Sequence, residues 1–298
     1  MDKNAAINFI LQNARPLELA IYKNFFEHES SQAVVDELLI FQNSDGGFGN
    51  ALEPDFFNLN SSPIATNDAI ITLYRANALD RNSDIVKGIV KYLESHDSFD
   101  KNKKRWLFAI DSNKDYPHAI WWEKKGDGIS GFNPSISLAA FWVCYGNRTP
   151  LYEEIVKDGF ECLETTEEIS SDSLKCFLLA YALLKSNGIN NIIDLEHFKE
   201  LLCKAVCNSI CKDISKYGVE YVPMPSDFFC GTYSEFITSE IKPLIEAEKN
   251  ILGKLQMEDG GFDITWKWYT PYSEFEQARA WWRPRITLEK LLFNEMQL

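Results

Sequence analysis

The chain has 298 residues, of which 45% are apolar and 13% aromatic, and its formal net charge is −14. This composition can build a sizeable buried core, and no apolar stretch reaches the roughly 18 residues that a membrane span requires. The negative charge and the scattered Lys and Arg exclude nucleic acid as an expected partner, because a phosphate backbone is bound by clustered basic residues.

Compartment and domain organisation follow from the first residues and the cysteines. The sequence begins without the charged and then apolar profile of a secretory signal. Its seven cysteines, an odd number, mostly stand in apolar helical runs. Reduced core thiols are typical of a cytoplasmic protein. We therefore expect a cytoplasmic protein with a single domain over residues 1–298.

Apolar residues recur at helical spacing along almost the whole chain, and no run of strict alternation indicates a strand. The pattern predicts an all-α protein. The predicted helices cover residues 4–14, 17–28, 31–42, 63–79, 84–95, 134–146, 150–164, 171–186, 195–212, 235–256 and 286–296. Long loops are predicted at residues 43–61, 97–132, 214–234 and 257–284, and loops of that length are usually functional.

The predicted helix starts rest on residues whose side chains can bind the free amides of a first helical turn. In several cases a proline follows at the first helical position. The N-cap candidates are Ser30, Ser62, Ser83, Asn133, Thr149, Ser170 or Ser171, Asp194 and Thr287.

One phrase, Gln-x-x-Asp-Gly-Gly-Phe, occurs twice, at Gln42–Phe48 and at Gln256–Phe262. Each copy closes an apolar helical run, and its paired glycines supply backbone angles that other residues reach only at a cost. A second repeat relates the helix starts Ser62–Ala69 and Asn133–Ala139. The repeats predict antiparallel helix pairs, which must stack in a line or close into a ring to bury both faces.

The segment Gln42–Asp68, which reads QNSDGGFGNALEPDFFNLNSSPIATND, resembles the repeat of squalene and other terpenoid cyclases and of protein prenyltransferase β-subunits. The second copy, at residues 256–263, is similar but shorter. The resemblance implies an α/α toroid, in which an inner ring of helices surrounds a central cavity and an outer ring encloses it. It also implies a hydrophobic, isoprenoid ligand in that cavity.

The catalytic motifs of these families are absent from the chain. The Asp-x-Asp-Asp acid motif of cyclases does not occur. Asp227 and Cys230 could stand for two zinc ligands of a prenyltransferase, but no histidine follows His197 to complete the set. The Cys-His pair of the lanthionine cyclases, another toroid family, is also missing. We therefore expect no metal and no cofactor.

Carboxylates and aromatic residues cluster in three segments that we expect to lead to the inner ring. Carboxylates can act as acid and base, whereas indoles can stabilise a carbocation, hold a prenyl chain or stack on a sugar. The candidate catalytic residues are Glu53, Asp55 and Asp127. The candidate ligand-binding residues are Trp121, Trp122, Trp268, Tyr269, Trp281, Trp282, Arg283 and Arg285.

Two expectations concern how these candidates act. Glu53 and Asp55 flank a proline, and if both face the cavity, their repulsion raises one pKa and makes an acid–base pair. Arg283 and Arg285 either bind a phosphate or carboxylate with the N-terminus of the helix predicted at 286–296, or pair with loop carboxylates.

Three functions remain open on the sequence, and whether the protein is an enzyme remains open with them. The first is a cyclase- or prenyltransferase-like protein that binds or transforms an isoprenoid. The second is a carbohydrate-active toroid, a lyase or hydrolase, and the third is a binding module without chemistry. A dry aromatic chamber with one carboxylate would favour the first, and an open cleft with two carboxylates would favour the second.

Overall fold

A computed structural model describes residues 1–166 and 168–297 of the chain. These residues are mostly helical, which confirms the all-α prediction. The only strands among them are two of two residues each, Phe99–Asp100 (β1) and Arg105–Trp106 (β2), which form an antiparallel hairpin within the predicted loop 97–132. The strands escaped prediction because two residues are too few to show an alternating pattern.

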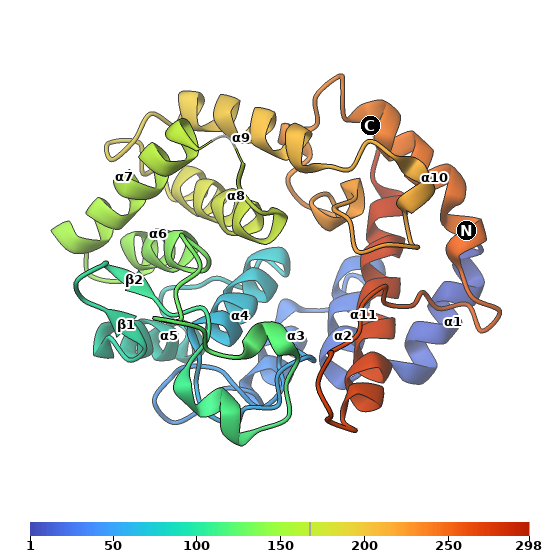
Figure 1. Ribbon diagram of the computed structural model, residues 1–298, viewed down its shortest axis with the longest axis horizontal. Coiled ribbons are helices and arrows are strands. Elements are labelled where there is room, and N and C mark those ends of the chain that lie inside the picture. Colours follow the sequence, from blue (N-terminus) through green and yellow to red (C-terminus); the bar gives the residue numbers. More distant parts are fainter. Residues whose placement is uncertain (167, 298) are drawn as a thin grey trace.

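Eleven α-helices lie in the described residues, and their order along the chain is shown in Figure 1. They are α1 (Lys3–Asn13), α2 (Pro16–Tyr22), α3 (Ser31–Leu39), α4 (Pro63–Arg75), α5 (Asp84–Ser95), α6 (Ser135–Tyr145), α7 (Pro150–Thr165), α8 (Ser171–Ser186), α9 (Leu195–Ser209), α10 (Lys242–Leu255) and α11 (Phe275–Glu295). A π-helical turn, Lys23–Glu27, continues α2, and short 3₁₀ turns include Pro225–Asp227 (η5) and Ser234–Phe236 (η6).

The last helix differs most from its prediction. α11 begins at Phe275 rather than near residue 286, and Pro284 lies inside it. A proline usually marks a helix start, but its missing amide can also be accommodated within a helix whose packing is strong enough. Thr287 is therefore not an N-cap, and Trp281, Trp282, Arg283 and Arg285 are helical rather than loop residues. α10 likewise begins at Lys242, after η6, rather than at 235.

Several helix starts agree with the predicted capping chemistry. The Ser62 hydroxyl accepts a hydrogen bond from the amide of Ala65 at 3.1 Å, and Pro63 follows at the first helical position. Ser30, Ser83, Ser170 and Asp194 cap α3, α5, α8 and α9 in the same way. These caps fix the residue at which each helix begins. They therefore also fix the direction in which each side chain of the first turn points.

Some helices lie at the periphery of the molecule and others nearer its middle. In Figure 1, α1, α7, α9 and α10 lie toward the outside, whereas α4, α6, α8 and α11 lie nearer the centre. α6 packs against both α4 and α8, and α11 packs against α1 and α2. The first and last helices of the chain are therefore neighbours.

One buried apolar cluster extends from Leu17 in α2 to Phe293 in α11 and includes residues of most helices. Two smaller clusters adjoin it, one of which contains Phe56, Trp122 and Trp268. No helix among the described residues is both long and apolar enough to span a bilayer. The prediction of a single domain stays a prediction.

The two copies of the glycine phrase form the same turn. In the first, the Gln42 side-chain amide donates to the Gly46 carbonyl at 3.0 Å, and Asp45 accepts from the Gly47 amide at 2.9 Å. In the second, Gln256 donates to Gly260 at 2.8 Å, and Asp259 accepts from Gly261 at 3.0 Å. The phrase therefore encodes one local structure twice.

Each turn also binds two helices. Gln42 donates to the Ile85 carbonyl at the start of α5, and Gln256 donates to the Asp2 carbonyl, just before α1. The following phenylalanine amide donates to a threonine hydroxyl, of Thr66 in α4 or of Thr287 in α11. The second turn thus joins α11 to α1 as the first turn joins α4 to α5.

Replacing Gly46 by alanine tests this turn. Gly46 has φ +95°, and an added Cβ would collide with the carbonyl of Gly88 in α5. We expect Gly46→Ala to lower the free energy of unfolding by about 2–5 kcal/mol, because backbone strain and a steric clash add. Denaturant titration of both proteins would measure the change.

Gly188→Ala is the matched control, because Gly188 has φ +66° but no atom within 4 Å of an added Cβ. It should cost only the about 1–2 kcal/mol of a left-handed backbone. Equal losses in the two variants would contradict a specific contact between the turn and α5.

Candidate functional site

Asp55 lies at the centre of the candidate site and is held by two indoles. Its side chain is 2% exposed. The Nε1 of Trp266 donates to one carboxylate oxygen at 3.0 Å, and the Nε1 of Trp268 donates to the other. Both tryptophans lie on the loop that follows the second glycine turn, so two of the predicted segments meet at this carboxylate.

The Asp55 loop is also fixed through its backbone. The amide of Ala119 donates to the Asp55 carbonyl, and that of Phe57 donates to the Pro117 carbonyl, each at 3.0 Å. The Ile120 amide donates in turn to the Trp268 carbonyl at 3.0 Å. Three loops that are far apart in the sequence therefore hold one another in place around Asp55.

The two neighbouring carboxyls Glu53 and Asp55 have different surroundings. Burial raises the pKa of Asp55, and the hydrogen bonds from Trp268 and other indoles oppose that rise. Burial raises the pKa of Glu53 well above its usual range; Arg285 and Arg15 oppose the rise, and the nearby Asp68 and Asp55 add to it. No described residue donates a hydrogen bond to the Glu53 side chain. Glu53 is therefore the carboxyl that holds a proton most readily.

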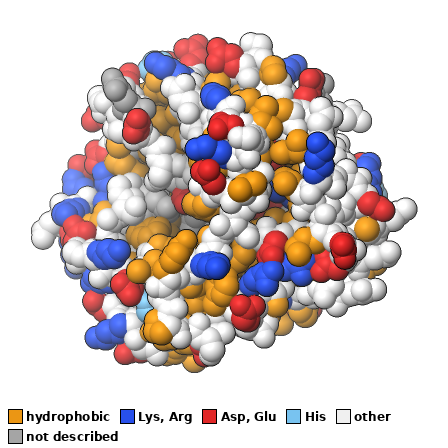
Figure 2. Space-filling model, turned by 45° about the vertical axis from the view of Figure 1, so that its right-hand side comes forward, with side chains coloured by type: hydrophobic (Ala, Val, Ile, Leu, Met, Phe, Trp, Pro, Cys, Tyr) orange, Lys and Arg blue, Asp and Glu red, His pale blue; other side chains and the backbone are white. Residues whose placement is uncertain are grey.

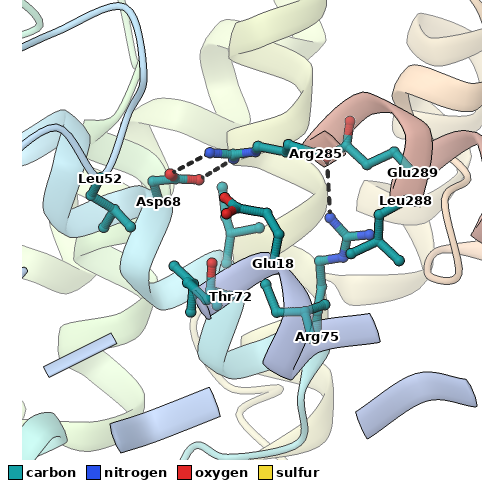
Figure 3. Close-up of a pocket in the computed structure, with 11 residues that line it drawn as sticks. Glu18, Leu52, Asp68, Thr72, Arg75, Arg285, Leu288 and Glu289 are labelled. Atoms are coloured by element: carbon teal, nitrogen blue, oxygen red, sulfur yellow. Dashed lines mark hydrogen bonds and ion pairs between the residues drawn. The ribbon is translucent and has the colours of Figure 1, made fainter. Parts of the chain in front are cut away.

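Arg285 forms a two-bonded ion pair with Asp68, which joins α11 to α4 (Figure 3). The guanidinium donates to the two carboxylate oxygens at 3.0 and 2.6 Å. Below it, Arg75 of α4 pairs with Glu289 of α11 at 3.4 Å. The two pairs line a small cavity of about 30 Å³, which is room for about one water molecule.

Aromatic rings surround the carboxyls. The rings of Trp266 and Trp282 meet edge to face at 5.3 Å, and Arg285 lies over Trp282 at 5.0 Å. Trp281 stacks on Phe57 at 5.2 Å. All of these rings are partly exposed. Figure 2 shows hydrophobic side chains gathered across one face of the molecule, with charged side chains among and around them.

Asp127 contacts neither Glu53 nor Asp55. It is exposed, pairs with Lys103 and accepts from the Ile129 amide at 3.0 Å. Hydrogen bonding by Lys103 lowers its pKa, so that Asp127 is ionised and cannot hold a proton near neutral pH. It lies in a surface turn that is closed by a hydrogen bond from the Gly128 amide to the Lys125 carbonyl.

The remaining predicted residues differ in their exposure. Trp122 is buried and stacks on Phe56 and Phe108, and Trp121 is partly buried beside them. Tyr269 is 75% exposed. Arg283 donates two hydrogen bonds to Asp259, at 2.9 and 2.8 Å, which is the alternative of pairing with a loop carboxylate.

Sequence reasoning missed a group that contributes to the same region. Tyr221 lies in the predicted loop 214–234, and its ring meets that of Trp266 edge to face at 5.7 Å. Burial raises its pKa to about 12, with Asp172, Asp227 and Glu53 contributing and Lys175 opposing. The only signal was the length of the loop, because no motif contains Tyr221.

Among the described residues, no three His, Cys, Asp or Glu side chains are arranged so that they could hold a metal ion. No family model, curated protein or solved structure matches this chain. Inferences about function therefore rest on the residues themselves.

The raised pKa of Glu53 predicts how stability depends on pH. Between the pKa of Glu53 in the unfolded chain and its higher pKa in the folded protein, only the folded protein keeps this proton. The free energy of unfolding therefore falls as pH rises from the first pKa to the second. Glu53→Gln removes the effect. We expect the variant to gain stability relative to the parent as pH rises above about 5, as measured by denaturant titration.

Asp127→Asn is the control, since its lowered pKa leaves Asp127 ionised in both states over that range. Its difference from the parent should not change with pH. A Glu53→Gln difference that is equally constant would contradict a proton held by Glu53.

Proposed function

We propose that the chain is an α/α toroid whose central hollow binds a carbohydrate and cleaves it by acid–base chemistry, with Glu53 as proton donor and Asp55 as its carboxylate partner. The single observation that carries the chemistry is the contrast between these two carboxyls. One is held by two indole N–H groups, whereas the other accepts no hydrogen bond from a described residue, and burial raises its pKa well above the usual range. Such a contrast is how neighbouring carboxyls divide the roles of acid and base.

The toroid is supported by the way the two ends of the chain meet. The glycine turn after α10 binds the residue before α1, in the same manner as the turn after α3 binds α5. From α6 to α9 the helices also alternate between the middle and the outside. A ring of helical hairpins accounts for both observations, whereas an open stack would leave its first and last helices apart.

Asp55 is suited to remain ionised during the reaction. An indole N–H can only donate, so both carboxylate oxygens act as acceptors, and a proton on either would displace one of these bonds. An ionised Asp55 stabilises positive charge that develops on a sugar ring. Glu53 gives its proton to the oxygen of the leaving group as the bond from that oxygen to the sugar carbon breaks. A water molecule adds to this carbon and gives a proton back to a carboxylate.

The polarity of the hollow favours a sugar over a prenyl chain. Besides Glu53 and Asp55, charged groups in the region include Asp68 and Arg285. Trp282 adds a third buried N–H beside Asp55. A ligand hydroxyl both accepts and donates, and can therefore bind such a donor and a carboxyl together.

An isoprenoid ligand is the second candidate, and a specific observation favours it. The indoles of Trp266 and Trp282 meet beside Asp55, two residues from Glu53, and indole faces stabilise carbocations formed by protonating an alkene. In this candidate a cyclase- or prenyltransferase-like protein binds or transforms the isoprenoid. In either case we propose a cytoplasmic protein, a setting that fits its seven free cysteines.

The test combines binding with turnover. Purified protein is screened by thermal shift and by product analysis against neutral and acidic oligosaccharides and against geranyl and farnesyl diphosphate. We expect oligosaccharides to raise the melting temperature and to be cleaved. Glu53→Gln should lower kcat by at least roughly a hundredfold, the usual contribution of a general acid.

Glu123→Gln is the matched control, because Glu123 is an exposed carboxyl in another loop. It should cleave oligosaccharides like the parent. Binding without turnover would instead identify a binding module, and a response to prenyl diphosphates alone would establish the second candidate.

A further inference from the structure

Tyr221 stands at the edge of the Glu53–Asp55 centre on a loop of its own. Its ring contacts Trp266, whose Nε1 binds Asp55 at 3.0 Å, so a single side chain separates Tyr221 from the carboxylate. Three loops converge here: the Glu53–Asp55 loop, the Trp266 loop and the loop before η5. A ligand with more than one sugar ring would extend from the two carboxyls along one of these three loops.

Tyr221 is both accessible and surrounded. Its side chain is 66% exposed. Its pKa is raised to about 12, chiefly by burial, so that the phenol is neutral. The hydroxyl forms no hydrogen bond with another described residue. The Tyr221 hydroxyl is thus a neutral group that can still donate and accept hydrogen bonds, and it lies at the end of an aromatic ring.

The charged groups around Tyr221 select the kind of ring that fits. Lys175 of α8 donates to Asp172 at 3.1 Å, so these two charges balance each other. Asp227 has no cationic partner within ion-pair distance in the part of the chain that the structure describes; it accepts a hydrogen bond from the amide of Met224 at 2.7 Å. The excess charge is therefore negative, and it would repel a carboxylate on the ligand.

We propose that Tyr221 is a substrate-contacting residue that forms a second ring-binding subsite beside the Glu53–Asp55 centre, and that this subsite takes an uncharged sugar ring. The ring stacks on the face of Tyr221, and its hydroxyls bind the phenol group. This inference rests on the proposed carbohydrate function and adds to it a second contact and a choice between neutral and acidic sugars.

Calorimetric titration with two tetrasaccharides tests the subsite. The probes are cellotetraose, which is neutral, and tetragalacturonic acid, which is charged. We expect the parent to bind cellotetraose more tightly. Tyr221→Ala should weaken this binding on the order of tenfold, because a stacked aromatic contact is lost, whereas Tyr221→Phe should weaken it less.

Val219→Ala is the matched control, because Val219 is 71% exposed on the same loop. It should bind cellotetraose as the parent does. Asp227→Asn keeps an acceptor for the Met224 amide and should strengthen the binding of tetragalacturonic acid. Melting curves of all variants show whether each remains folded.

The outcomes separate this inference from the function on which it rests. Equal affinity of Tyr221→Ala and the parent for cellotetraose overturns the subsite and leaves the proposed function standing. Preference of the parent for tetragalacturonic acid overturns the uncharged ring. A parent that binds neither probe, nor any other oligosaccharide, overturns the proposed function and this inference together.

Discussion

The repeated glycine turn is the constraint on which the rest of the structure depends. At each copy a glutamine side chain, an aspartate and a glycine with positive φ fix the path of the chain, and a threonine hydroxyl binds the next amide. A Cβ cannot enter at Gly46 or Gly260, because a backbone carbonyl of a neighbouring helix lies against each. The turn therefore sets both the direction of the chain and the distance between helices.

The candidate site inherits its geometry from these turns. Thr66 and Thr287 fix the positions of α4 and α11 relative to the two turns, and Asp68 and Arg285 lie two residues after the first threonine and two before the second. Their two-bonded ion pair is partly buried, and a pair taken out of water is favourable only when its hydrogen-bond geometry is good. It holds α4 against α11 and supplies the opposing charges that act on Glu53.

Much of the fold could be predicted because local chemistry dominates it. Serine caps, prolines at first helical positions and apolar periodicity give the starts of α3, α4, α5 and α8 to within a residue. The same rules failed at α11, where Pro284 reads as a helix start but lies inside the helix. A sequence pattern cannot show that packing by Thr287, Leu288 and Leu291 carries the helix past a proline.

The sequence by itself determined an all-α chain, two glycine turns of the same structure, and the aromatic and acidic residue types of the candidate site. These depend on periodicity, capping and backbone freedom, which neighbouring residues decide. Only the tertiary structure decided that Asp55 meets the indoles of Trp266 and Trp268, that Arg285 meets Asp68, and that Asp127 stays on the surface. Those contacts join residues far apart in the chain, and the charge and solvation of each carboxyl depend on which groups fold around it.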